Sequence, residues 1–383
     1  MERRFLKIII FTGLLITSCQ QIPINESNKK FVGDNIDKQN LEIDLKKQEK
    51  IISYHSDIWS YILTNSSYTS DGLDEQTLIY MNRHLQDLDK FKEFLNDSYY
   101  FIFFVIEELE NAKLPIELAF LPYIESNYDP FSISSSGAVG MWQFMPRTGR
   151  TYDLERSWWN EDRHDPFKST SAAIKYLKYL YERFDQDLYL TLAAYNAGPS
   201  FLDRQIKRNQ RRGLNTDYWS LDLPIQTRNY VPKFIAIKEL IINSDQYDIE
   251  LPFIPYEPVV AKIEIPGQVE ILTLSEYLNI KPELLYKLNA GYTKWASAPS
   301  EKSVFYIPIE QYDYFQTSEN PFSDSNQINW ISHTVESGDN LWSLARKYDT
   351  EVRIIREINF LENDLLSINT TLLIPLSKTE SNN

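Results

Sequence analysis

Residues 121–146 read LPYIESNYDPFSISSSGAVGMWQFMP, and this stretch decides both the fold and the chemistry that we expect. Glu125 directly follows an apolar segment, so its carboxyl group is expected to lose part of its hydration. Such a loss disfavours the charged form and favours a proton donor near neutral pH. Gly137 and Gly140 allow the backbone to turn sharply and to approach a ligand closely. The large side chains after them are expected to form an apolar wall: Met141, Trp142, Phe144 and Met145.

The order of residues in this stretch resembles a known catalytic signature. Glu125-Ser126 is followed by a loop and then by GAVGMWQFMPRTG at residues 137–149. The lytic transglycosylases of peptidoglycan, which are goose-type-lysozyme-like members of glycoside hydrolase family 23, have Gly-Ala-x-Gly-x-Trp-Gln-Phe-x-Pro-x-Thr-Gly at this place. Taken alone, Glu125 also fits a helix end followed by a loop without chemistry. The length of the match favours the catalytic interpretation.

Two further segments follow in the family's order. AAYNAG, which includes Tyr195 and Asn196, fits a simple helix end, but it also resembles the second signature, whose Tyr and Asn line the sugar cleft. QTRNYV resembles the third signature, whose Tyr, here Tyr230, lies beside the catalytic acid. The resemblance covers about residues 70–250 and extends to the membrane-bound D-type transglycosylases. It implies a mainly α, lysozyme-like catalytic domain over residues 71–250.

The resemblance also implies a reaction that uses one glutamate twice. Glu125 protonates the glycosidic oxygen between N-acetylmuramic acid and N-acetylglucosamine, and then activates the muramoyl 6-hydroxyl for internal attack. The product is a 1,6-anhydro sugar. Carried over by position, the residues expected to contact the sugar are Ser134, Gln143 and Met145, and those expected to frame the acid are Tyr195, Asn196 and Tyr230.

Two alternatives remain open from the sequence. A hydrolysing muramidase needs a second carboxyl group, but Asp129-Pro130 is a standard turn pair, and Asp162 and Asp165 belong to a loop before a capped helix. The second alternative is a catalytically inactive scaffold that only binds peptidoglycan. We expect no metal site and no cofactor, because the four histidines are scattered and no Gly-rich phosphate loop is present.

The N-terminus has the pattern of a bacterial lipoprotein. Three basic residues precede an apolar run over residues 8–16, which is too short to span a bilayer and suits a signal peptide. The run ends at Cys19, the only cysteine, in a stretch that resembles a lipobox. We expect a signal peptide over 1–18 and a lipid anchor with a polar tether over 19–70. The alternative is that Cys19 is a buried thiol. The resemblance implies a lipoprotein that faces the periplasm, and Gln20, which follows the cysteine where an Asp would retain the protein in the inner membrane, favours the outer membrane of a Gram-negative bacterium.

The C-terminal third predicts two small α+β modules. Residues 255–310 show a β-α-α-β order, which we interpret as a degenerate LysM-like module; a small α+β subdomain without glycan affinity fits as well. A linker is expected over 311–331. Residues 332–376 open with HTVESGDNL and resemble a LysM module, a kind that binds chains containing N-acetylglucosamine. The expected fold is therefore multidomain, with a mainly α catalytic domain followed by βααβ LysM-type modules.

The charge of the chain excludes one class of partner. There are 54 Asp and Glu residues against 39 Lys and Arg, a net charge of −15, which argues against nucleic acid. Long-range attraction is therefore not expected to drive binding to an anionic polymer either. Recognition must be short-range, through hydrogen bonds and aromatic faces, and 25 Tyr and 8 Trp residues supply such faces.

Overall fold

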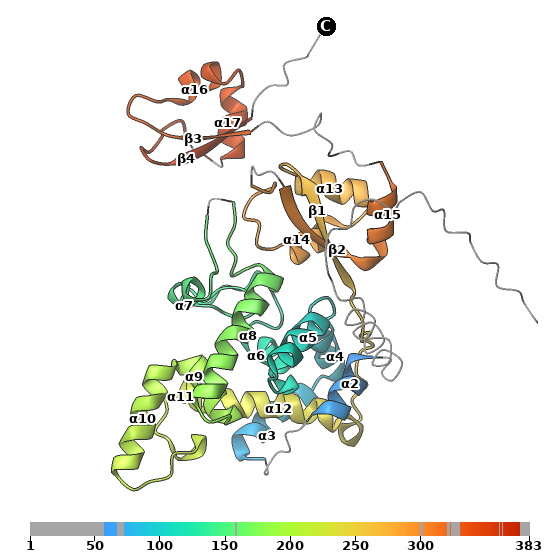
Figure 1. Cartoon of the computed structure of the whole chain (residues 1–383), viewed down its shortest axis with the longest axis vertical. Helices are drawn as coiled ribbons and strands as arrows, with labels where there is room; N and C mark the ends of the chain where they lie inside the picture. Colours follow the sequence, from blue (N-terminus) through green and yellow to red (C-terminus); the bar gives the residue numbers. More distant parts are fainter. Residues whose placement is uncertain are drawn as a thin grey trace, which may run out of the picture. The chain divides into compact units, whose positions relative to one another are not determined.

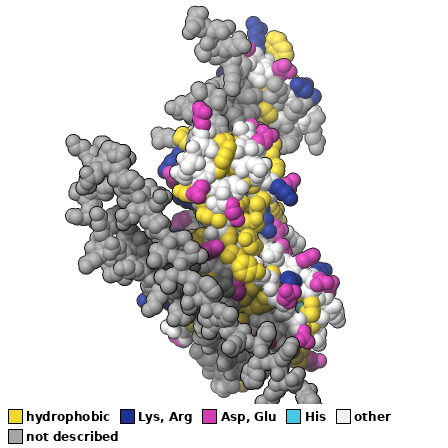
Figure 2. Space-filling model, turned by 90° about the vertical axis from the view of Figure 1, so that its right-hand side faces the viewer, with side chains coloured by type: hydrophobic (Ala, Val, Ile, Leu, Met, Phe, Trp, Pro, Cys, Tyr) yellow, Lys and Arg dark blue, Asp and Glu magenta, His cyan; other side chains and the backbone are white. Residues whose placement is uncertain are grey.

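The computed structural model describes residues 57–66, 73–157, 159–298, 302–319, 322, 330–359, 361 and 363–375. The predicted signal peptide, Cys19 and most of the predicted tether lie outside these ranges. Among the described residues no helix is both long and apolar enough to cross a membrane. On the face drawn in Figure 2, Lys and Arg are scattered among Asp and Glu, and the described surface shows no basic stripe.

The catalytic region is helical, as predicted (Figure 1). Its longest buried element is α12 (Tyr230–Ile242), which packs against helices α3 and α9 and the segment before Glu125. Because α12 is apolar on most sides, the other helices can cover most of its surface. The remaining helices are α2 (Ile58–Asn65), α3 (Glu75–Leu85), α4 (Leu88–Asn96), α5 (Ile102–Ala112), α6 (Leu121–Glu125), α7 (Pro146–Thr151), α8 (Pro166–Arg183), α9 (Leu188–Ala197), α10 (Pro199–Arg211) and α11 (Ile225–Arg228). Short 3-10 turns are η2 (Ile116–Phe120), η3 (Tyr218–Ser220) and η4 (Ser244–Tyr247).

The predicted end of the tether at residue 70 is wrong. Helix α2 begins after Asp57, whose side chain caps it, and buries Ile58, Trp59 and Ile62 in the catalytic core. The indole Nε1 of Trp59 donates to the carbonyl oxygen of Pro252 at 2.6 Å. The buried residues of IWSYILTN, at positions 58, 59, 61 and 62, have the spacing of one face of a short helix, so this segment belongs to the domain.

The first small module has the predicted β-α-α-β order. Strand β1 (Val260–Pro266) pairs antiparallel with β2 (Lys302–Pro308), from Val260 opposite Pro308 to Pro266 opposite Lys302. Helices α13 (Ile271–Leu278) and α14 (Pro282–Leu288) cover the sheet and close a separate apolar core. The predicted linker is partly wrong, because η5 (Ile309–Gln311) leads into α15 (Tyr312–Thr317), whose aromatic side chains Tyr312 and Phe315 pack on this core.

The second small module repeats that order. Strand β3 (Trp330–Thr334) pairs antiparallel with β4 (Thr371–Pro375), and α16 (Leu341–Lys347) and α17 (Val352–Ile358) lie between them in sequence. The HTVESGDNL pattern is explained by folding: Asp339 accepts hydrogen bonds from Glu336 N and His333 Nε2, each at 2.8 Å, and Asn340 forms a capping box with Ser343 at the start of α16.

One side-chain network is common to both modules. Asn289 ends α14 and donates from Nδ2 to the carbonyl oxygens of Leu285 and Tyr306, while its Oδ1 accepts from Tyr306 N. Asn359 follows α17 and makes the same three bonds with Ile355 and Leu373. The amide thus joins the second helix to the closing strand in each case, which supports the interpretation of residues 255–310 as a LysM-like repeat.

Candidate active site

Glu125 is the last residue of α6, a short helix of 5 residues. The chain runs through the 3-10 turn η2 and then restarts as α6 with Pro122 in its first turn. Pro122 therefore lies in the first turn of a short helix, where its missing N–H costs no hydrogen bond within the helix. Ser126 then donates its hydroxyl to the carbonyl oxygen of Met141 at 2.8 Å, which ties this helix end to the Gly-rich loop.

The carboxyl group of Glu125 is partly buried and accepts a hydrogen bond from the phenol of Tyr230, 105 residues further along the chain. Burial raises the pKa of Glu125 to about 7, although the Tyr230 hydrogen bond and the charge of Lys233 act in the opposite direction. Burial also raises the pKa of Tyr195 and Tyr230 well above the ordinary range of a phenol, and the charge of Glu125 adds to the shift. The site thus holds an acid that is half protonated near neutral pH beside phenols that remain donors.

The loop over residues 132–144 folds back on itself and fixes both predicted polar residues of the stretch. Ser134 accepts a hydrogen bond from Ala138 N at 2.9 Å and contacts the hydroxyl of Ser136. Gln143 adopts a left-handed φ of 49° and donates from Nε2 to the carbonyl oxygen of Gly140 at 2.9 Å. A non-glycine residue in this conformation is uncommon and is held there by its surroundings.

A buried ion pair clamps this loop from outside. Arg163 and Glu161 are 7% and 6% exposed and form paired hydrogen bonds of 2.8 and 2.9 Å. Arg163 Nη1 also donates to the carbonyl oxygen of Phe144 at 3.1 Å. Burial alone would raise the pKa of Glu161, but the hydrogen bonds and the charge of Arg163 outweigh burial and lower it. The backbone at Gly140 lies so close to Arg163 that a Cβ there would overlap the Arg163 carbonyl oxygen.

The predicted apolar wall is mostly core. Met141, Trp142 and Phe144 are almost completely buried, and only Met145 is exposed, at 43%. The indole of Trp142 donates to Thr170 Oγ1 at 2.9 Å inside the domain. A run of large residues in the sequence does not show which of them point into the core, because the fold of the loop decides this.

Four of the predicted residues surround one cavity of about 240 Å³. Gln143 and Met145 come from the loop and its end, and Tyr195 and Asn196 from the last turn of α9. Gly198 follows at φ 85° and ends α9, so the predicted helix end is confirmed. Tyr195 donates its hydroxyl to the carbonyl oxygen of Trp142 at 2.8 Å, which joins α9 to the loop. Ser134 lies instead in the turn of the loop.

Sequence reasoning missed several residues that hold this site. Arg163 and Glu161 follow a tryptophan-rich segment without any recognisable pattern, and only the fold shows that their charges are buried and paired. Thr227 donates to Asn196 Oδ1 at 2.9 Å and so connects the second and third signatures. Lys233 lies one helical turn after Tyr230 and close enough to Glu125 to lower its pKa. The spacing from Tyr230 is the signal in the sequence from which this cation could have been predicted.

Comparison with known proteins gives the class. The transglycosylase SLT domain matches residues 104–217, and the LysM domain matches residues 333–375. The chain therefore carries a domain of the transglycosylase class together with a LysM domain. Tyr230 lies beyond the matched range and is assigned from its contact with Glu125.

The membrane-bound lytic murein transglycosylase D of Escherichia coli strain K12 is 29% identical to this chain over 340 residues, which are 84% of this chain and 74% of that protein. A putative tributyltin chloride resistance protein of Alteromonas sp. strain M-1 is 37% identical over 106 residues, 28% of this chain and 51% of that protein. The solved 70 kDa soluble lytic transglycosylase of Escherichia coli aligns with 48% of this chain and 32% of its own, at 17% identity and a TM-score of 0.31, a score too low for comparison in detail.

Proposed function

We propose that the protein cleaves the bond between N-acetylmuramic acid and N-acetylglucosamine in peptidoglycan, with Glu125 acting first as acid and then as base. The observation that carries this proposal is the pKa of Glu125, raised to about 7 beside the Tyr230 phenol. In the first step the protonated carboxyl gives its proton to the glycosidic oxygen, and the bond from that oxygen to the muramoyl C1 breaks. In the second step the carboxylate takes the proton of the muramoyl 6-hydroxyl, whose oxygen bonds to C1. The acid is thereby restored and no water is consumed.

An internal nucleophile removes the need for a second carboxylate. Its effective concentration is very high, because it is already part of the bound sugar. The groups that oppose the raised pKa of Glu125 are Tyr230 and Lys233, whereas a neighbouring carboxylate would raise it further. Two of the acids considered from the sequence have structural tasks: Asp129 accepts from Phe131 N, and Asp165 caps α8. These observations favour a transglycosylase over a muramidase.

Digestion in water enriched in ¹⁸O separates the two reactions. A transglycosylase incorporates no label into the new chain end, whereas a hydrolase incorporates one ¹⁸O atom for each bond cut. We expect products without label. Uptake of one label per cut would support the muramidase, and the absence of any released product would support an inactive scaffold.

Substrate contact is assigned to the cavity that Tyr195 lines, because the Tyr195 phenol also interacts with the charge of Glu125. We infer that Gln143, Met145, Tyr195 and Asn196 bind the sugar at the cleavage site, because they surround one cavity, and that Ser134 acts from the adjacent turn. Tyr230 positions the carboxyl group of Glu125 through its hydrogen bond. Aromatic, amide and thioether side chains suit a neutral sugar with acetamide groups.

Tyr230→Phe should move the alkaline limb of the pH profile upward. The hydrogen bond from Tyr230 lowers the pKa of Glu125, so its loss leaves the carboxyl group protonated to a pH above about 7. The pH dependence of kcat/KM reports the free enzyme and is the measurement. Tyr195→Phe is the matched control, since that phenol donates to the Trp142 carbonyl oxygen. An alkaline limb that stays in place or moves downward in Tyr230→Phe would contradict the assignment.

The LysM module is proposed to hold the enzyme on chains that contain N-acetylglucosamine. Its exposed Trp342, 65% accessible at the start of α16, offers a flat face to a sugar ring. Removal of residues 332–383 should weaken sedimentation with insoluble peptidoglycan and leave cleavage of short soluble glycans nearly unchanged, because a tethered module raises the local substrate concentration without taking part in the chemistry. Equal sedimentation of the shortened and the full chain would count against a glycan-binding LysM.

We further propose that Cys19 carries a lipid that anchors the enzyme to the outer membrane on its periplasmic side. The support is the sequence before Cys19 and the name of the Escherichia coli relative, a membrane-bound lytic murein transglycosylase. Cys19→Ala should lose the label from radioactive palmitate and leave the membrane fraction, since stable anchoring needs more than one acyl chain. Unlabelled wild-type protein, or a label that persists in Cys19→Ala, would exclude the lipid.

A further inference from the structure

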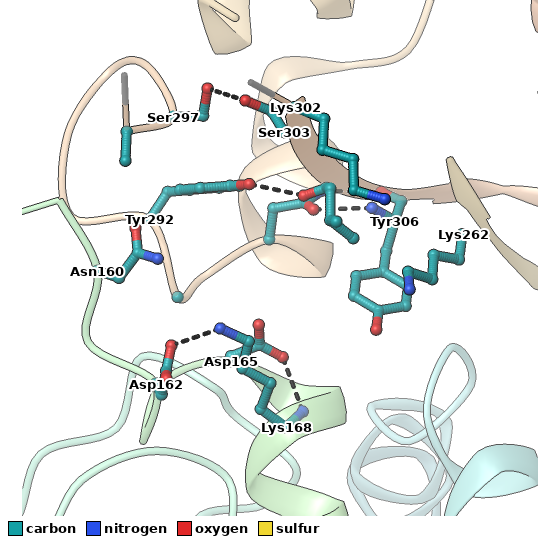
Figure 3. A pocket seen from close by; sticks show the side chains of 14 residues that line it. Asn160, Asp162, Asp165, Lys168, Lys262, Tyr292, Ser297, Lys302, Ser303 and Tyr306 are labelled. Atoms are coloured by element: carbon teal, nitrogen blue, oxygen red, sulfur yellow. Dashed lines mark hydrogen bonds and ion pairs between the residues drawn. The ribbon is translucent and has the colours of Figure 1, made fainter. Parts of the chain in front are cut away.

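A second cavity, of about 490 Å³, lies between the start of α8 and the β1–β2 sheet (Figure 3). Its two walls are joined by main-chain hydrogen bonds of 2.8 Å from Glu161 N to Gly291 O and from Thr293 N to Trp159 O. The ring of Phe167 also stacks on Tyr306 with the centroids 3.7 Å apart. These contacts preform the cavity, and its volume suits a ligand of several residues.

The walls carry opposite charges. Asp162 and Asp165 project from the α8 side, where Asp162 pairs with Lys168 at 2.8 Å (Figure 3). Asp165 accepts from two main-chain N–H groups at the start of α8. Burial raises the pKa of Asp165, which is the effect expected where an ionised carboxylate lacks sufficient compensation, and a bound cation would reverse it.

The opposite wall is cationic. Lys262 from β1 and Lys302 from β2 both lie near one carboxylate, Glu264, at 3.8 and 2.7 Å. Glu264 thus pairs closely with Lys302 and lies farther from Lys262, so it compensates the ammonium charge of Lys262 only weakly. Between the walls, Asn160 Oδ1 is buried and has no hydrogen-bond partner among the residues that the structure describes. Buried acceptors are nearly always satisfied, so this amide oxygen points to a donor supplied by a ligand.

We propose that this cavity binds the short side peptide of peptidoglycan, an inference that rests on the function proposed above. An ammonium group of the peptide lies toward Asp165, a carboxylate toward Lys262, and a peptide N–H toward Asn160. The glycan itself offers only uncharged hydroxyl and acetamide groups, which cannot form ion pairs with two facing walls of opposite charge. The side peptide offers both charges and amide donors on one short chain. The cavity therefore selects glycan strands that carry peptides, and Glu125 is not among the residues that line it.

The test is a titration of the purified full chain with the free tetrapeptide of the wall, followed by NMR or calorimetry. Lys262→Gln and Asp165→Asn should each weaken binding roughly tenfold, the effect of one charged contact of about 1.4 kcal/mol. Asparagine caps a helix as well as aspartate, so Asp165→Asn keeps the start of α8 intact. Lys92→Gln, which breaks an exposed ion pair with Glu250 outside the cavity, is the matched control and should bind as the wild type does.

Blocked peptides distinguish contact from a structural effect. Acetylation of the side-chain amine, the one ammonium group that the peptide keeps when it is attached to the glycan through its N-terminus, should weaken binding to the wild type about tenfold and leave the already weakened binding to Asp165→Asn unchanged. Failure of the wild type to bind the free peptide would overturn the inference, as would equal binding by Lys262→Gln, Asp165→Asn and Lys92→Gln. Release of products from peptidoglycan by the wild type is scored separately: cleavage without peptide binding refutes only this site, and peptide binding without cleavage refutes only the proposed reaction.

Discussion

Glu125→Gln should abolish turnover and leave the fold intact. The amide keeps the shape of the side chain and its place beside Tyr230, but it cannot transfer a proton. Loss of a single general acid typically costs about 10²–10⁴-fold in rate, and here the same group also serves as the base, so we expect a loss at or beyond the upper end of that range. The measurement is the release of soluble products from purified peptidoglycan. A variant that retains near-normal release would show that Glu125 is not the acid.

The same variant has a second expected effect, which shows that it is folded. The pKa of Glu125 is raised in the folded state from 4.5 to about 7, so between these values the folded protein holds a proton that the unfolded chain has lost. The contribution of Glu125 to stability is therefore complete below about pH 4.5 and is lost as the pH rises to about 7, by at most roughly 3 kcal/mol. Glutamine has no such loss. Urea unfolding should show that the free energy of unfolding of Glu125→Gln rises relative to that of the wild type between pH 5 and 8. A difference between the two proteins that stays constant over this range would contradict the raised pKa.

Gly140→Ala should disrupt the site through its loop. The backbone there has φ 82°, and a Cβ would overlap the Arg163 carbonyl oxygen, which is main chain and cannot move aside cheaply. Gly137→Ala is the matched control, because Gly137 has nearly the same φ, 85°, with nothing near the position of a Cβ. The conformational strain alone costs about 1–2 kcal/mol in both variants. Overlap should add roughly 1–3 kcal/mol or more in Gly140→Ala.

Two measurements distinguish these glycine variants. Thermal unfolding should place Gly140→Ala clearly below Gly137→Ala, and product release should fall much further in Gly140→Ala, because the loop carries Gln143 and ends at Met145. Equal stability and equal activity of the two variants would mean that the close approach to Arg163 does not hold the loop. With that outcome, the contact between Gly140 and Arg163 would not stabilise the active site.

The order of helices and the acid could be predicted because both leave local signals. Proline and glycine mark the ends of α8, α9 and α10, and Asn289 and Asn359 stand at matching places in the two small modules. The contact between Glu125 and Tyr230 was predicted only through the family's third signature, since no local pattern connects residues so far apart in the chain.

What the sequence could not predict depends on the direction of side chains and on pairing at a distance. Trp142 looked like part of a cleft and is core, because the turns of its loop direct it toward Thr170. Arg163 carries a charge and is nevertheless buried, because Glu161 and a loop carbonyl group satisfy its hydrogen bonds. Such outcomes follow from the tertiary arrangement and leave no trace in composition or spacing.

The central claim, one glutamate that serves as acid and base for an internal attack, is tested most directly by the ends of the released chains. Purified peptidoglycan is digested with the wild-type protein and, in parallel, with Glu125→Gln, and the products are analysed by mass spectrometry. We predict muropeptides that end in 1,6-anhydro-N-acetylmuramic acid from the wild type and none from Glu125→Gln. Reducing ends from the wild type, each heavier by one water molecule, would contradict the account.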